Sequence, residues 1–207
     1  MPAAIEHAYH VAMQRPFGPT FVSIPEDDWD RETVETPLRR VIADVVASPE
    51  GIETILAALA ASARPAIVVG PGVDRDDASA ATVALAERLG AAVYVSPLSS
   101  RCSFPERHPN FAGFLAPVRT HVVERLREHD LVLVLGAPVF TYHVFTDGPP
   151  IAEGTVVVQV TDDPDAVASA AAGTSIVATL RATLDAVLAC MPPEPRAGSG
   201  VARAAPR

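Results

Sequence analysis

The sequence contains few cysteines, few basic residues and no long apolar run, and each shortage argues against a class of protein. Its two cysteines, Cys102 and Cys190, form no CxxC motif and no Cys/His cluster with zinc-like spacing, which is typical of a reducing compartment. The 16 basic residues are scattered among 25 acidic ones, so no basic stripe is present to neutralise nucleic-acid phosphates. No apolar run approaches the roughly 20 residues that cross a bilayer, and the start of the chain lacks the features of a signal peptide. We therefore expect a cytoplasmic protein with no nucleic-acid or membrane partner.

What the sequence does contain is an alternation of short apolar runs and amphipathic segments. We predict strands at 65–70, 91–96, 131–136, 155–160 and 174–179, and helices at 48–62, 76–90, 118–128, 164–172 and 179–191. Ser48 and Pro49 are typical of a helix N-terminus, and Gly90 is typical of a helix C-terminus. Because the strands are apolar throughout and alternate with helices, they predict an α/β fold: an open parallel sheet, Rossmann-like, with helices on both faces.

The two ends of the chain differ from this middle part. Residues 3–15 predict a short amphipathic helix and residues 20–25 a buried strand, and such a pair cannot bury its own apolar faces. We interpret the pair as the end of a domain whose beginning is missing. The predicted division is an incomplete domain end at 1–25, a charged linker at 26–40, an α/β domain at 41–191 and a disordered linker or tail at 192–207.

The turn GPGVDRDD, residues 70–77, follows a predicted strand and opens a helix, where parallel α/β proteins bind ligands. Its glycines would let the backbone approach a pyrophosphate at a helix N-terminus. The third glycine of that motif is absent, however, and Asp74, Asp76 and Asp77 would stabilise the helix dipole and repel a phosphate. We favour a structural role for this turn over a nucleotide site.

The loop at 99–115 gathers three phenylalanines with Cys102 and His108. A Cys-His nucleophile needs the two side chains to be adjacent and a third group to orient the base, and the sequence shows neither. We interpret the loop as one that packs under its own aromatic residues. His7 and His10 lie about one helical turn apart, but two solvated histidines on a helix are commoner than a metal site.

The segment GAPVFTYHVFTDGPP, residues 136–150, concentrates aromatic residues in a chain that has few. It contains Phe140, Tyr142, His143 and Phe145 directly after an apolar strand. From the residues alone, the favoured interpretation is aromatic packing at the edge of the sheet, with the histidine bonded to a carbonyl group. His143 nevertheless lies past the carboxyl end of a strand, where a parallel sheet places its ligands.

Three stretches of the chain resemble the thiamine diphosphate-dependent 2-oxo acid decarboxylases. They are GPTFVSIPEDDWD at 18–30, the run from PAIVVGPGVD to HPNFAGFL at 65–115, and HDLVLVLGAPVFTYH at 129–143. They follow the order and spacing of that family over most of residues 1–190. Within the family they are most similar to the members that convert benzoylformate, an aryl 2-oxo acid, to benzaldehyde and carbon dioxide. The resemblance implies three α/β domains, in the order pyrimidine-binding, central and diphosphate-binding. By that resemblance, residues 1–25 match the end of the pyrimidine-binding domain, 26–40 the connector and 41–191 the central domain.

The resemblance also implies a role for His143. The match to GAPVFTYH makes it a catalytic residue, and an imidazole that titrates near neutrality suits proton transfer during decarboxylation. Thiamine diphosphate and Mg²⁺ would be bound by the flanking domains, because the family's activating glutamate and GDG motif do not occur here; the chain itself would hold no cofactor and no metal. The implied partners are a small 2-oxo acid substrate, the two flanking domains and further copies of the chain in a tetramer.

Two other functions stay open at this point. The chain could be an FAD- or nucleotide-binding central domain similar to that of the acetohydroxyacid synthases, although the acidic GPGVDRDD turn argues against this. It could also be a non-catalytic association module, since it lacks the catalytic motifs of the flanking domains. For the isolated chain we expect no decarboxylase activity.

Overall fold

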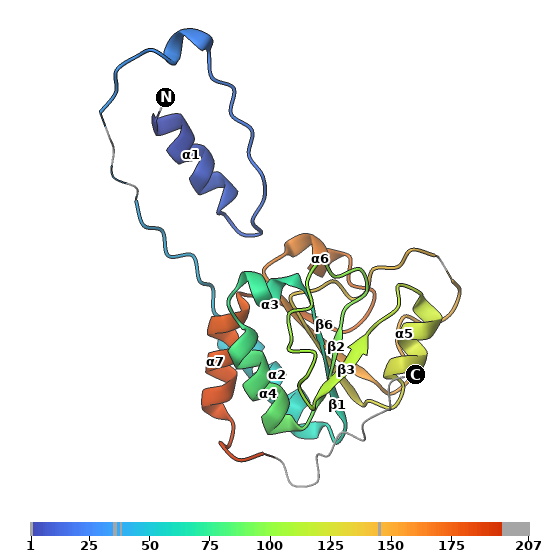
Figure 1. Ribbon diagram of the computed structural model, residues 1–207. Helices are drawn as coiled ribbons and strands as arrows, with labels where there is room; N and C mark the ends of the chain where they lie inside the picture. Colours follow the sequence, from blue (N-terminus) through green and yellow to red (C-terminus); the bar gives the residue numbers. More distant parts are fainter. Residues whose placement is uncertain (1, 35–36, 38, 145, 196–207) are drawn as a thin grey trace. The chain divides into compact units, whose positions relative to one another are not determined.

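The computed structural model describes residues 2–34, 37, 39–144 and 146–195, and the chain divides into two units, Met1–Asp44 and Val45–Arg207. The larger unit is an α/β structure built on one six-stranded sheet, which confirms the predicted fold class (Figure 1). Phe145 and most of the predicted tail, 196–207, lie outside the described residues. In the described part of the chain, no helix combines the length and the apolar content of a membrane span.

Every strand of the sheet runs parallel to its neighbours, in the order β3-β2-β1-β4-β5-β6. The strands are β1 (Pro65–Val69), β2 (Ala92–Val95), β3 (Phe111–Phe114), β4 (Leu131–Leu135), β5 (Val156–Thr161) and β6 (Thr174–Val177). Five of them coincide closely with the predicted strands. The sixth, β3, lies inside the loop at 99–115, where we predicted none. It is a four-residue edge strand with a glycine, so its pairing with β2 decides its conformation rather than its own residue pattern.

The larger unit has a helix at each of the five predicted places, although the one predicted at 164–172 ends at Ala168, and one short helix that we did not predict, at Pro71–Arg75. They are α2 (Pro49–Ala61), α3 (Pro71–Arg75), α4 (Ser79–Leu89), α5 (Arg119–Leu126), α6 (Pro164–Ala168) and α7 (Leu180–Cys190). As predicted, Ser48 caps α2, its Oγ accepting a hydrogen bond of 3.2 Å from the Gly51 amide, and Gly90 ends α4 in the left-handed conformation with a φ of 59°. The helix expected from residue 76 begins later, because the preceding turn forms α3.

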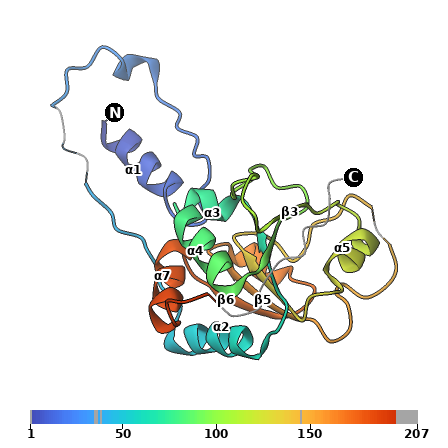
Figure 2. The same ribbon diagram turned by 60° about the horizontal axis from the view of Figure 1, so that its bottom comes forward.

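The inner strands β1, β2 and β4 are buried on both faces, which explains why their sequences are apolar without alternation. In β1, Ile67 and Val69 pack in an apolar cluster with α2, α4 and α7. Ala66 and Val68 point to the other face and pack in a second cluster with α5. Figure 2 shows α2, α4 and α7 together on one side of the sheet and α5 on the other. Since burying one large apolar side chain stabilises a fold by about 1.5–3 kcal/mol, these two clusters are the main source of stability.

The strand order reverses between β1 and β4, and glycines let the two strand ends meet there. The Gly72 amide donates a hydrogen bond of 3.1 Å to the Gly136 carbonyl. A Cβ atom at Gly72 would lie 2.6 Å from the Gly136 Cα, and one at Gly70 would lie 2.5 Å from the Ala137 Cβ. Gly136 also has a φ of 62°, in the region that favours glycine. The two backbones therefore close the space between the carboxyl ends of these strands.

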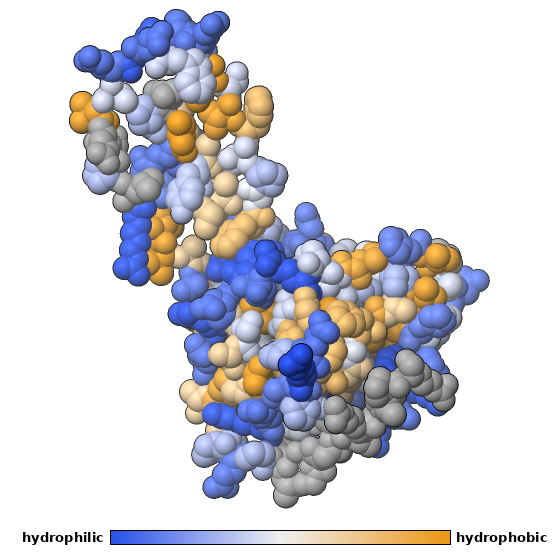
Figure 3. All heavy atoms as spheres, in the orientation of Figure 1, coloured by the Kyte–Doolittle hydropathy of each residue, from blue (hydrophilic) through white to orange (hydrophobic). Residues whose placement is uncertain are grey.

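The smaller unit contains α1 (Pro2–Ala12), which overlaps the helix predicted at 3–15 and ends before it, and a 3-10 helix at Glu26–Asp28. The strand that we predicted at 20–25 is wrong, because these residues have no strand partner in the described chain and a strand needs a neighbour for its backbone hydrogen bonds. Apolar side chains of this unit consequently stay at the surface, and Phe21 is 93% exposed. Figure 3 shows apolar residues at the surface of this unit.

The close contact between Gly72 and Gly136 predicts that adding one methyl group at Gly72 destabilises the fold. Gly72→Ala should lower the free energy of unfolding by about 2–3 kcal/mol, because the new methyl meets backbone atoms that cannot move aside. Gly18→Ala is the matched control, since no atom lies within 4 Å of a Cβ at Gly18. The measurement is urea unfolding followed by circular dichroism. Equal midpoints for the two variants would contradict the close contact.

Candidate functional site

The segment at 136–150 leaves the carboxyl end of β4, and its first residues belong to the core. Ala137, Val139 and Phe140 are buried in the apolar cluster on the α5 face. The buried Gln159 side chain donates a hydrogen bond of 2.8 Å to the Ala137 carbonyl, and the Ala171 amide donates one of 3.2 Å to the Val139 carbonyl. Phe140 is therefore a core residue, as the packing interpretation of this segment proposed.

His143 has a fixed backbone and an exposed side chain. Its main-chain amide donates a hydrogen bond of 3.0 Å to the Pro117 carbonyl, and Val144 forms a parallel bridge with Val118. The imidazole is exposed, and among the described residues it has no hydrogen-bonding partner. The carbonyl bond that we expected from the residues alone is thus made by the backbone amide rather than by the ring. The ring stays available to a ligand at this edge of the sheet.

Tyr142 and Arg119 lie beside His143 and support the same segment. The guanidinium carbon of Arg119 lies 5.5 Å from the centre of the Tyr142 ring, and Arg119 Nη1 donates a hydrogen bond of 3.2 Å to the Gly148 carbonyl. Burial raises the pKa of the Tyr142 hydroxyl, and the nearby Arg119 charge lowers it by less. Sequence reasoning missed Arg119, because a lone arginine at the start of a predicted surface helix carries no signal.

The GPGVDRDD turn has the structural role that we favoured from the sequence. Asp74 pairs with Arg101 at 2.7 Å, and Asp76 accepts a hydrogen bond of 2.7 Å from the Leu180 amide at the start of α7. Arg75 forms an ion pair with the buried Asp162 at the end of β5. These contacts join β1, β5 and α7, so the carboxylates of the turn bind protein groups rather than face an open anion site.

Cys102 and His108 have separate partners. Cys102 Sγ donates a hydrogen bond of 3.1 Å to the Phe104 carbonyl. His108 Nδ1 accepts one of 3.2 Å from the Asn110 amide, while its Nε2 lies 3.3 Å from a Glu87 carboxylate oxygen. The loop also packs under Phe104, whose ring meets His108 edge-on at 5.1 Å. This geometry agrees with the packing interpretation.

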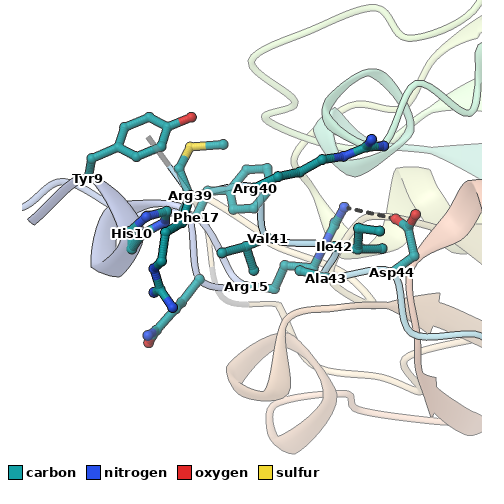
Figure 4. Close-up of a pocket in the computed structure, with 12 residues that line it drawn as sticks. Tyr9, His10, Arg15, Phe17, Arg39, Arg40, Val41, Ile42, Ala43 and Asp44 are labelled. Atoms are coloured by element: carbon teal, nitrogen blue, oxygen red, sulfur yellow. Dashed lines mark ion pairs between the residues drawn. The ribbon is translucent and has the colours of Figure 1, made fainter. Parts of the chain in front are cut away.

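The smaller unit contains a cavity of about 600 Å³, lined by α1, by the residues that follow it and by residues 39–44 (Figure 4). Arg15 crosses the cavity to pair with Asp44 at 3.8 Å. His10, which also lines it, lies 3.5 Å from Glu6. Across the described ranges, no three His, Cys, Asp or Glu side chains are placed to hold a metal, so the His7 and His10 pair remains without further ligands.

His129 contrasts with His143, because its ring is held inside the structure. Nδ1 lies 3.2 Å from the Arg64 carbonyl and Nε2 lies 3.2 Å from the Tyr94 hydroxyl, so the neutral ring donates to the first and accepts from the second. Burial lowers the pKa of His129, and the backbone bond to Arg64 opposes this by less. His129 lies just before the amino end of β4, at the opposite edge of the sheet from the carboxyl ends of the strands, and has a structural role.

The six-stranded parallel sheet with helices on both faces defines an α/β domain, and comparison with known proteins identifies its class. Residues 52–187 match the family model for the thiamine pyrophosphate enzyme, central domain. Benzoylformate decarboxylase from Pseudomonas aeruginosa is 38% identical over 200 residues, which are 95% of this chain and 38% of that protein.

Two solved structures share the arrangement. Benzoylformate decarboxylase from Polynucleobacter necessarius matches with a TM-score of 0.85 and 34% identity, over 95% of this chain and 37% of that one. The thiamine diphosphate-dependent 4-hydroxybenzoylformate decarboxylase from Rhodococcus jostii RHA1 matches with a TM-score of 0.84 and 37% identity, over 95% and 38%. The chain therefore belongs to the thiamine pyrophosphate enzymes and contains their central domain, which confirms the resemblance seen in the sequence. It spans 38% of the length of the curated relative.

The lowered pKa of His129 predicts a loss of stability in weak acid. Above the ordinary histidine pKa of about 6.5, neither the folded nor the unfolded state carries the proton, and the contribution is complete. As the pH falls below that value, the unfolded chain binds a proton that the folded chain rejects, until the folded-state pKa is reached. His129→Gln should reduce the difference between urea midpoints at pH 7.5 and pH 5.5, and His121→Gln, at an exposed site, should not. An unchanged difference in His129→Gln would refute the assignment.

Proposed function

We propose that the chain is the central domain of a thiamine diphosphate-dependent decarboxylase acting on an aryl 2-oxo acid, and that His143 transfers a proton in its active site. The observation that carries the proposal is the position of His143: an exposed imidazole on a backbone fixed by Pro117, beyond the carboxyl edge of a parallel sheet. The similarity to enzymes named benzoylformate and 4-hydroxybenzoylformate decarboxylase supports the aryl substrate.

The chemistry of His143 follows from its surroundings. Its ring is exposed to solvent, an imidazole is a group suited to proton transfer, and its main chain is held by residues 117–118. A side chain that donates a proton to a reacting carbon must be accessible to the substrate and held at a fixed position relative to it. The first condition is satisfied by exposure and the second by the backbone contacts.

The described residues do not fit a site for magnesium and diphosphate. No metal-holding group of three ligands occurs among them, and the glycine turn at 70–77 presents carboxylates that already bind the Arg101 guanidinium and the Leu180 amide. When bound, thiamine diphosphate supplies the carbanion chemistry of its family. We propose that flanking domains hold that cofactor and Mg²⁺, since the chain spans 38% of its curated relative.

The same proposal includes the predicted domain division. Residues 1–25 would complete a pyrimidine-binding domain, 26–40 would connect it to the central domain at 41–191, and 192–207 would lead to the diphosphate-binding domain. The exposed apolar side chains of the smaller unit, including Phe21, support this, because they have no cover of their own. We also propose that the complete protein is a cytoplasmic homo-oligomer.

The FAD-binding alternative is less well supported by the geometry. Rossmann-type sheets bind dinucleotides in the crevice where the strand order reverses. Here the backbones of Gly72 and Gly136 meet in that place, and the turn itself forms the five-residue helix α3. A non-catalytic association module remains the second candidate, favoured by the missing cofactor ligands in the described residues.

The first test concerns cofactor binding by the isolated chain. Titration calorimetry with thiamine diphosphate and Mg²⁺ should show no saturable heat, and an assay with benzoylformate should show no aldehyde release, because the described part of the chain offers no group of side chains that could hold the metal. One-to-one binding or measurable turnover would contradict the proposal that flanking domains hold the cofactor and Mg²⁺.

The second test concerns His143 in a complete enzyme. The chain is placed between the flanking domains of the Pseudomonas aeruginosa benzoylformate decarboxylase, and the active hybrid serves as reference. His143→Ala should lower kcat for benzoylformate about 100- to 10,000-fold without changing the melting temperature, in keeping with general acid-base catalysis. His121→Ala, at another exposed histidine, should leave both unchanged. Full turnover in His143→Ala would refute the catalytic role.

A further inference from the structure

The start of α5 holds the segment that carries His143 at three points. The Pro117 carbonyl binds the His143 amide at 3.0 Å, and Val118 forms a bridge with Val144. Arg119 then contacts the segment before and after His143: it lies over the Tyr142 ring and binds the Gly148 carbonyl at 3.2 Å. One side chain thus connects two points of the segment that are separated by His143.

The position of Arg119 in its helix is electrostatically unfavourable. It is the first residue of α5, and the first turn of that helix contains no acidic residue. A cation at a helix N-terminus meets the positive end of the helix dipole, which costs about 0.3–1 kcal/mol at an exposed site. Departures from local preference are expected where a residue serves a site rather than its own element. The contacts with Tyr142 and Gly148 offset this cost.

We propose that Arg119 is a positioning residue for His143. Its planar guanidinium lies over the Tyr142 ring while one nitrogen donates to the Gly148 carbonyl, so that the Tyr142 side chain and the Gly148 backbone, on either side of His143, are held by one residue. A lysine has a point charge and no planar surface, so it would keep the positive charge but not this paired geometry. The proposal rests on the proposed function only for its catalytic consequence, because the holding of the segment is a property of the chain itself.

The first experiment measures how firmly the His143 backbone is held. It uses the full chain and needs no enzyme assay. Amide hydrogen exchange by NMR reports on the His143 N–H, which is bonded to Pro117. Arg119→Ala should speed its exchange at least 10-fold, and Arg119→Lys should give an intermediate increase. Arg127→Ala is the matched control, since Arg127 ends the same helix and pairs with the exposed Glu124. Unchanged exchange in Arg119→Ala, with the fold intact by circular dichroism, would overturn the proposal.

The second experiment uses the active hybrid enzyme and a double-mutant comparison. Arg119→Ala should lower kcat about 10- to 100-fold with little change in KM, because displacement of a catalytic group by about 1 Å can cost that much. In a protein already carrying His143→Ala, the same change should have no further effect. An additional loss there would show that Arg119 acts independently of His143 and would overturn the positioning role.

The two experiments also separate this inference from the proposed function. If His143→Ala leaves turnover unchanged, the proposed function fails, while faster exchange at His143 in Arg119→Ala still supports the holding of the segment. If His143→Ala abolishes turnover but Arg119→Ala changes neither exchange nor kcat, the proposed function stands and the positioning role is wrong.

Discussion

The larger unit depends on the contact between two glycine backbones, at Gly72 after β1 and Gly136 after β4. Neither position has room for a Cβ atom, so the carboxyl ends of the two central strands approach as closely as backbones allow. This contact closes the place where related sheets leave a crevice for a nucleotide. It also turns the chain at Gly136, whose positive φ sends the next residues across the α5 face of the sheet. The location of His143 follows from that turn.

The segment after Gly136 divides into a buried part and an exposed part. Ala137, Val139 and Phe140 contribute apolar surface to the core, and burial of that surface offsets the entropy lost when the segment is ordered. His143 can therefore stay solvated and still have a defined backbone. An exposed loop without this apolar start would have to be ordered by polar contacts alone, each of which contributes only about 0.5–1.5 kcal/mol.

The two edges of the sheet have different roles. At the amino edge, Asp130 accepts hydrogen bonds from the Ala63 and Arg64 amides at 2.8 and 3.0 Å, and His129 links Arg64 to Tyr94. These groups form hydrogen bonds with one another and so join the end of α2 to β1 and β4. At the carboxyl edge, the His143 amide is bonded to the Pro117 carbonyl and the imidazole is exposed. The histidine ring at the amino edge therefore joins elements of the fold, whereas only the main chain of His143 does so.

The sequence by itself determined the features that depend on nearby residues. Five apolar strands, the Ser48 cap and the Gly90 terminus follow from local periodicity and backbone preference, and the likeness of GAPVFTYH to its family pointed to His143. Only the tertiary structure decided the features that depend on distant partners. Phe111–Phe114 forms a strand because β2 lies beside it, whereas residues 20–25 form none because no strand does. Arg119 is recognised only when α5 packs against the segment around His143, because hydrogen bonds and ring contacts between distant residues leave no local pattern in the chain.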